Sequence, residues 1–151
     1  MCKMPLALAA ALAAIAATGC GSTPAPVATL THFDAQSNAI CVRLSQEQAA
    51  IEARSRFSGE TGQTVWREIV AVSRAADVKV KALPTPSAQA GTIERLIAAY
   101  FEEARDEDNI ANAYGSGDTA AVETAYSNFI GLARRDAAVA RSLGMIACAK
   151  A

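Results

Sequence analysis

Five acidic residues fall within the seven positions from Glu102 to Asp108, and they are the residues best suited to chemistry. In a helix, Glu103 and Glu107 lie one turn apart on one face, and so do Glu102 and Asp106. Carboxylate oxygens at that spacing suit a hard cation, so Glu103 and Glu107 are the candidate metal ligands. The alternative, which we favour, is a solvated acidic face that is partly neutralised by nearby arginines. The arginines in question are Arg105, Arg134, Arg135 and Arg141.

Other candidate site residues are scattered along the chain. Asp136 falls in step with the apolar positions of the last helical segment, and we expect it at the core boundary with an arginine partner, because an unpaired buried acid is costly. Aromatic residues between helices could line a ligand cleft, although at helical spacing they are usually core. These residues are Trp66, Tyr100, Tyr114 and Tyr126. The single histidine, His32, is expected to be inert.

The sequence lacks the residue sets that common catalytic sites require. Without a histidine in the predicted folded part, neither a Ser-His-Asp site nor the Glu-x-x-His pairs of a di-iron bundle can form. No glycine-rich phosphate loop follows a strand. The net charge of −1 argues against a basic nucleic-acid binder. We therefore expect no enzyme activity, no cofactor and no nucleic-acid partner.

Residues 1–19 have the layout of a secretory signal. The apolar stretch from Leu6 to Ala17 is too short to span a bilayer of about 30 Å at about 1.5 Å per residue. It is followed by Thr18-Gly19-Cys20, and this ending resembles the lipobox of bacterial lipoproteins, with Ala17 where leucine is usual. The resemblance implies that Cys20 is lipidated and becomes the mature N-terminus. The alternative is a plain secreted protein cut near Ala17 or Gly19, with Cys20 as an ordinary thiol.

The segment after the signal indicates how the protein is attached to a membrane. Residues 20–33 begin with a run of Ser, Thr and Pro that is typical of a flexible tether. Stable anchoring takes two or more acyl chains, such as palmitate, and the lipoproteins that this signal resembles carry at least two. We therefore expect an exported protein, lipid-anchored to the cell membrane or the outer membrane and facing the extracytoplasmic space.

Beyond the tether, residues 34–149 show helical periodicity interrupted by short breaks. The expected helices span about 34–57, 63–82, 86–114 and 118–143. Breaks of three to five residues permit only antiparallel neighbours. The 36 alanines are helix formers that allow close packing. The sequence therefore predicts an all-α fold, an up-down-up-down four-helix bundle.

Local signals refine the ends of these helices. Thr85 and Pro86 are expected to start the third helix as N-cap and first helical residue. Asp118 is expected to cap the fourth helix. Gly144 is expected to end it, with Met145 or Ile146 folding back onto the last turn.

Two cysteines, Cys41 and Cys148, remain inside the expected bundle. Exported proteins form lasting disulfides, and an even number of antiparallel helices returns the chain to its starting end, which brings this pair together. The bond would close a loop of about 107 residues and contribute about 4.7 kcal/mol by loop-closure entropy. A redox pair or a metal site lacks support, because the spacing is not C-x-x-C.

The residues at the helix ends and the two cysteines resemble those of small alanine-rich exported proteins of high-GC bacteria, which are largely uncharacterised. The shared features are Cys41, Leu83-Pro84, Gly117-Asp118, and Leu143-Gly144 followed by Cys148. This resemblance implies a fold and no reaction. We expect a non-catalytic binding or structural module at the cell envelope, with an envelope protein as partner. The second candidate is a carrier for a small apolar ligand, metal or haem that uses the inter-helix aromatics.

Overall fold

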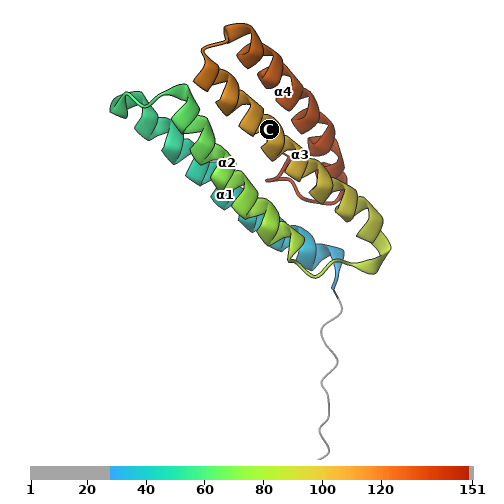
Figure 1. The fold of residues 1–151 in the computed structure, drawn as a ribbon. Coiled ribbons are helices and arrows are strands. Elements are labelled where there is room, and N and C mark those ends of the chain that lie inside the picture. Colours follow the sequence, from blue (N-terminus) through green and yellow to red (C-terminus); the bar gives the residue numbers. More distant parts are fainter. Residues whose placement is uncertain (1–27, 150–151) are drawn as a thin grey trace, which may run out of the picture.

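The computed structural model describes residues 28–149, and all regular structure in that range is helical (Figure 1). The helices are α1 (Leu30–Ser58), α2 (Gly62–Lys81), α3 (Ala90–Ser116) and α4 (Thr119–Ser142), with the short 3-10 helix η1 (Ser87–Gln89) before α3. Consecutive helices are antiparallel neighbours, and α1 and α4 share no extensive packing. The predicted fold class, an up-down-up-down four-helix bundle, is confirmed. Within residues 28–149, none of the helices is long and apolar enough to cross a membrane.

The predicted helix boundaries are most accurate for α2 and α4. Helices α2 and α4 begin and end within one residue of the predicted 63–82 and 118–143. The Asp118 side chain caps α4 by accepting a hydrogen bond of 3.0 Å from the Ala121 amide. Gly144 has a positive φ of 78°, and the Met145 amide donates to the Ala140 carbonyl at 2.9 Å, so the expected cap of α4 is confirmed.

Helix α1 begins four residues earlier than expected. The Thr29 side chain accepts a hydrogen bond of 3.2 Å from the His32 amide and so supplies an N-cap that the sequence analysis overlooked. His32 and Phe33 therefore lie in the first turn of α1, where His32 is exposed, and not in the tether predicted over 20–33. Phe33 is 1% exposed and belongs to the core.

The start of α3 was also predicted wrongly. The Thr85 hydroxyl donates to the Leu83 carbonyl at 3.4 Å and caps no helix. Pro86 has an extended backbone with ψ of 128°, and the turn of η1 separates it from α3. Helix α3 therefore begins four residues after the predicted position at Pro86.

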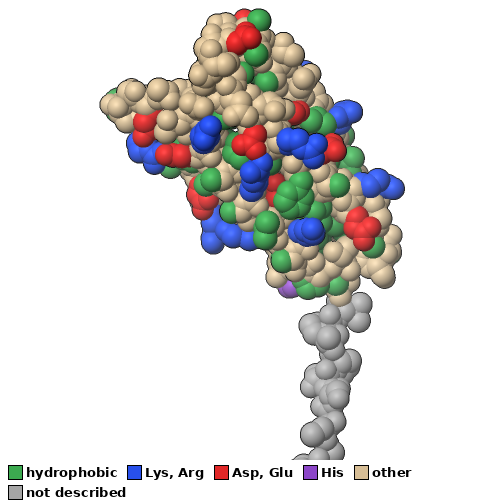
Figure 2. Space-filling view, in the orientation of Figure 1, with side chains coloured by type: hydrophobic (Ala, Val, Ile, Leu, Met, Phe, Trp, Pro, Cys, Tyr) green, Lys and Arg blue, Asp and Glu red, His purple; other side chains and the backbone are tan. Residues whose placement is uncertain are grey.

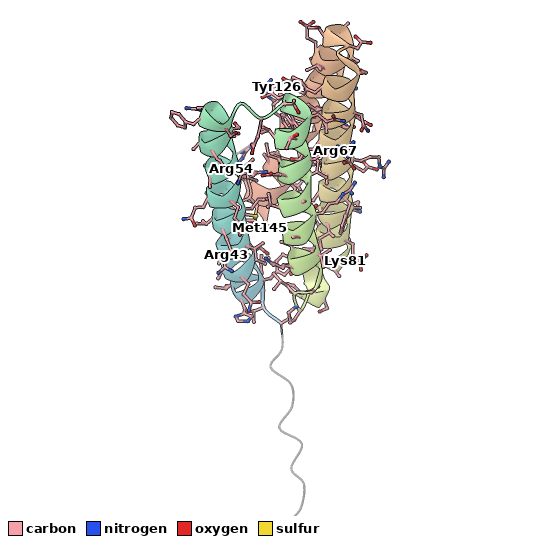
Figure 3. All side chains as sticks on the ribbon, turned by 60° about the vertical axis from the view of Figure 1, so that its left-hand side comes forward. Arg43, Arg54, Arg67, Lys81, Tyr126 and Met145 are labelled. Carbon is pink, nitrogen blue, oxygen red and sulfur yellow. A yellow bond between two sulfur atoms is a disulfide. The ribbon has the colours of Figure 1, made fainter. Side chains whose placement is uncertain are left out.

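Buried apolar residues occur along the whole bundle, and eight of them form one cluster at the end that we call the base. Here α1 and α3 begin and α2 and α4 end. The core residues are Phe33, Val80, Ile93, Leu96, Ile97, Ala140, Leu143 and Met145. Figure 3 shows Met145 inside the bundle, whereas Arg43 is exposed on α1. The base therefore brings together the ends of all four helices.

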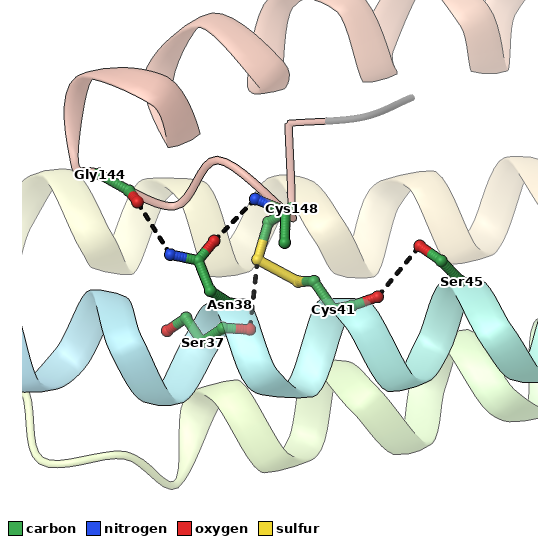
Figure 4. The surroundings of a disulfide bond; sticks show 7 residues. Ser37, Asn38, Cys41, Ser45, Gly144 and Cys148 are labelled. Atoms are coloured by element: carbon green, nitrogen blue, oxygen red, sulfur yellow. Dashed lines mark hydrogen bonds between the residues drawn. A yellow bond between two sulfur atoms is a disulfide. The ribbon is translucent and has the colours of Figure 1, made fainter.

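The tail, residues 143–149, closes the bundle covalently. It turns at Gly144 and runs back along α1, where Cys148 forms the predicted disulfide with Cys41 (Figure 4). The Asn38 side chain holds the tail by two hydrogen bonds, donating to the Gly144 carbonyl at 2.9 Å and accepting from the Ala147 amide at 2.7 Å. Because Cys41 lies about three turns into α1, the bond joins the tail to the middle of the bundle and not to the end of α1.

Candidate functional site

A cavity of about 130 Å³ lies among the helices. All four helices and the tail contribute to its wall. The polar residues that line it are Ser45 and Gln48 of α1, Ser73 and Asp77 of α2, and Tyr100, Glu103 and Glu107 of α3. Ser45 is exposed, so the cavity reaches the surface on the side of α1.

Helical spacing turns two acids of this wall inward. Asp77 lies four residues after Ser73 and three before Val80, and all three are buried. Glu107 lies between the buried residues Ala104 and Ile110 of α3. The side chain of Asp77 is therefore on the apolar stripe of α2 and only 7% of it is exposed, and Glu107 is only 4% exposed.

The expected solvated acidic face is therefore wrong for Glu103 and Glu107. Both line the cavity, whereas the other acids of the 102–108 run are exposed (Glu102) or half-buried (Asp106 and Asp108). Asp108 pairs with Arg74 of α2, which was not predicted. Within residues 28–149, no ion pair joins the acidic run to the arginines that were expected to neutralise it, Arg105, Arg134, Arg135 and Arg141. On the face seen in Figure 2, acidic and basic side chains are interspersed.

A chain of hydrogen bonds crosses the cavity wall from α1 to α3. The Gln48 amide donates to the Ser73 hydroxyl at 3.2 Å, and the Ser73 hydroxyl donates to Glu107 Oε1 at 3.2 Å. Three other polar atoms of the cavity wall have no hydrogen-bond partner among the described residues. No described residue donates to Glu107 Oε2 or Asp77 Oδ2, and the Tyr100 hydroxyl has no partner within residues 28–149 either. Buried polar atoms are normally hydrogen-bonded, so these three require an explanation.

Burial raises the pKa values of the acids that line the cavity. It raises the pKa of Asp77 to about 7 and that of Glu107 to about 7, although the Arg74 guanidinium acts against both shifts. Burial also raises the pKa of Glu103 to about 9, helped by a hydrogen bond to Asp136 and by the neighbouring acids. Of these acids, Asp77 and Glu107 therefore titrate close to neutral pH, and Glu103 titrates above it.

Asp136 occupies the half-buried position that the periodicity of α4 predicts, but without the expected arginine. Its neighbour is Glu103, and no described residue donates to its buried Oδ2 atom. Because the pKa of Glu103 is raised to about 9, its neutral carboxyl group can donate a hydrogen bond to the Asp136 carboxyl group, where an arginine was expected.

The cavity does not have the geometry of a metal site. The predicted ligands Glu103 and Glu107 both face it, but within residues 28–149 no three His, Cys, Asp or Glu side chains converge well enough to hold a metal ion. The carboxyl groups are near enough to influence one another electrostatically without closing around one point.

The four aromatic residues of the predicted cleft do not share one surface. Tyr100 lines the cavity, and Trp66 and Tyr126 lie against each other with ring centroids 6.1 Å apart. Tyr114 is far along α3, where its ring leaves no room for a Cβ atom at Gly62. Phe129 was not among the predicted cleft residues. Its ring centroid lies 6.3 Å from that of Trp66, and it also lines the cavity.

The sequence analysis missed Gln48, Ser73 and Asp77. The signal for Asp77 was present, because it is a polar residue in phase with the apolar stripe of α2, as Asp136 is in α4. Gln48 carried no signal, since amides are common on exposed helix faces.

The predicted lipid attachment at Cys20 and the signal at 1–19 lie outside the described residues. Comparison of the chain with known protein families, curated proteins and solved structures finds no match.

Proposed function

We propose that the protein is a non-catalytic module that binds a small ligand outside the cytoplasm and is anchored to a membrane by lipid on Cys20. The observation that carries the binding half is the cavity with its unpartnered buried acceptors at Asp77 and Glu107. Unpaired buried acceptors lower stability, and proteins retain such features mainly at functional sites. Of the two functions considered, the small-ligand carrier therefore has the better support.

The exported half of the proposal is supported by the chain's chemistry. The ending Ala17-Thr18-Gly19-Cys20 resembles a lipobox, and the Cys41–Cys148 disulfide is of a kind that persists in oxidising compartments. The tether would lead from Cys20 into the base of the bundle, where α1 begins. An envelope protein that docks on the exposed surface stays a prediction.

The proposal assigns no reaction to the cavity. Carboxyl groups with a pKa near 7 can act as general acids or bases, but catalysis also requires a reacting partner group. Ser73 donates its hydroxyl hydrogen to Glu107, and no histidine is among the residues that line the cavity.

Intact-mass measurement of membrane-extracted protein tests the anchor. We expect the mass of residues 20–151 plus at least two acyl chains, and a Cys20→Ser variant that is not acylated. An unmodified chain that begins at another residue would overturn the lipid anchor and leave the binding proposal in place.

A thermal-shift screen tests ligand binding. A ligand that binds only the folded state stabilises it by RT ln(1 + [L]/Kd). The panel contains small amines, neutral alcohols, divalent metals, haem and short lipids. We expect a rise in Tm for at least one class, and a panel without any shift would overturn the binding proposal.

A further inference from the structure

The unpartnered atoms of the cavity share one chemical character. Asp77 Oδ2 and Glu107 Oε2 belong to side chains that are 7% and 4% exposed, and both side chains line the cavity. An ionised carboxyl group only accepts hydrogen bonds, and the unpartnered Tyr100 hydroxyl can accept as well. A group that satisfies these atoms must therefore donate hydrogen bonds.

An ammonium group matches this requirement better than a metal ion. It carries three donors and forms charge-assisted hydrogen bonds of about 2.7–2.9 Å to carboxylates. A bound metal needs oxygen atoms closer still, at about 2.0–2.6 Å from one point. Within residues 28–149, acidic side chains do not converge in that way.

The size and the remaining wall of the cavity limit the rest of the ligand. The volume of about 130 Å³ is close to that of an apolar cavity of about 150 Å³ that holds benzene. The acids that line the cavity lie on α2 and α3, whereas α4 contributes the apolar residues Phe129 and Ala133. A ligand of about six to eight non-hydrogen atoms, polar at one end only, fits this division.

We propose that the cavity binds a small primary amine, whose ammonium group donates to Asp77, Glu107 and Tyr100 while its apolar body lies against Phe129 and the alanines. This inference rests on the proposed ligand-binding function and names the class of ligand. The specificity would come from the unpartnered acceptors, because a neutral molecule of the same shape leaves the carboxylates without their counter-charge.

Binding of an amine is coupled to proton release. The charged and titratable groups around the ammonium position are Arg74 and Asp77 of α2, Tyr100, Glu103, Glu107 and Asp108 of α3, and Asp136 of α4, whereas α1 contributes the neutral residues Ser45 and Gln48. A cation favours the ionised form of the carboxyl groups beside it. We therefore expect the affinity to rise between pH 6 and pH 8, with release of about one proton per amine at pH 6.

Isothermal calorimetry on the disulfide-bonded protein tests the inference with benzylamine and benzyl alcohol, which have the same shape and differ in charge. At pH 8 we expect the amine to bind at least tenfold more tightly than the alcohol. Repeating the amine titration at pH 6 in two buffers of different ionisation enthalpy measures the released protons.

The variants Asp77→Asn and Glu107→Gln remove the counter-charge without changing side-chain size, and each should weaken amine binding at least tenfold. Glu102→Gln makes the same charge change at an exposed position of α3 and should leave the affinity unchanged. Urea unfolding of all three variants establishes that they are folded.

The outcomes separate the two proposals. Equal affinity for the amine and the alcohol would overturn the amine inference and leave the ligand-binding function standing. Amine binding that Asp77→Asn and Glu107→Gln do not weaken would also overturn the inference. Failure of the amine, the alcohol and every other class in the thermal-shift panel would overturn both.

Discussion

The base and the cavity are built from the same four helices by opposite means. At the base, apolar side chains such as Phe33 and Met145 are at most 1% exposed and pack against one another. Further from the base, the same faces of α2 and α3 carry Asp77 and Glu107, which line the cavity. A single helical framework thus contains a region that stabilises the fold and a region that lowers its stability.

The contrast indicates how the protein tolerates an acidic cavity. Leaving buried acceptors unpaired costs about 1–3 kcal/mol each, against a typical total stability of about 5–15 kcal/mol. The disulfide and the apolar base lie next to the cavity, and Cys41 and Cys148 are part of its wall. We infer that these features hold the helices at the spacing that the cavity requires.

The largest effect should follow from removal of the disulfide. The Cys41→Ser/Cys148→Ser variant should lose up to about 4.7 kcal/mol of unfolding free energy, because the bond closes a loop of 107 residues. Urea unfolding measures the loss. Adding reductant should destabilise the wild type and leave the double variant unchanged, and equal stability of the two proteins would show that the bond contributes nothing.

The second largest loss of stability is expected from a substitution in the apolar base. Phe33→Ala should cost about 3–5 kcal/mol, because it leaves a cavity in a fully packed core. Phe57→Ala is the matched control, since Phe57 is 91% exposed at the other end of α1. Its effect should stay within about 0.5 kcal/mol. Similar losses in the two variants would contradict the placement of the core at the base.

The cavity should give the protein an unusual pH dependence. The pKa values of Asp77 and Glu107 are raised from 3.8 and 4.5 to about 7, so the folded state holds these protons more tightly than the unfolded chain. Their contribution to stability is complete below pH 4 and is lost as the pH rises toward 7. One such group lowers the unfolding free energy by about 2–3 kcal/mol between pH 5 and pH 7.

Urea unfolding at pH 5, 6, 7 and 8 measures this decline. Glu103, whose pKa is raised to about 9, extends it above pH 7. The triple variant Asp77→Asn/Glu103→Gln/Glu107→Gln should be more stable than the wild type at pH 8 and should show no such decline. A wild type that gains stability from pH 5 to pH 7 would rule out the raised pKa values.

A smaller effect is expected where the tail meets α1. Asn38→Ala removes two hydrogen bonds to the tail and should cost about 1–3 kcal/mol, because it leaves the Gly144 carbonyl and the Ala147 amide unpaired. Asn128→Ala, at an exposed position of α4, is the control and should have little effect. Hydrogen exchange at the Ala147 amide should speed up in the first variant only.

The smallest effect is expected at the surface, which belongs to neither region. Arg54 is paired with Glu60 and Glu68, and its side chain is 51% exposed. Arg54→Ala should change the unfolding free energy by less than about 1 kcal/mol, because exposed ion pairs are screened by water and salt. A loss as large as that of Phe33→Ala would mean that the far end of α1 is as important to stability as the base.

The fold was predictable because it depends on loop lengths and helix ends. Short breaks force antiparallel packing, and Asp118 and Gly144 mark the limits of α4 by side-chain and backbone chemistry that acts locally. The starts of α1 and α3 were mispredicted where several hydroxyl-bearing residues compete to cap a helix. Thr29 caps and Thr85 does not, and composition alone does not distinguish them.

The cavity was less predictable because burial and ionisation were treated separately. From the sequence, Glu103 and Glu107 were assigned to a solvated acidic face. A charged carboxylate is costly to bury. Burial raises the pKa of both carboxyl groups, and a protonated carboxyl group is less costly to bury than a charged one. In addition, acids at 102, 103, 106, 107 and 108 cover much of the circumference of the helix, so periodicity alone does not decide which of them face inward.

The position of the disulfide also determines how the molecule responds to a protease. Cys41 and Cys148 enclose α2, α3, α4 and every loop that joins the helices. A single cut anywhere between them leaves two fragments that remain joined, so the mass on a non-reducing gel hardly changes. Under the proposed lipid anchor at Cys20, a cut between Cys20 and Cys41 would release the bundle, because the Cys41–Cys148 bond does not span that segment.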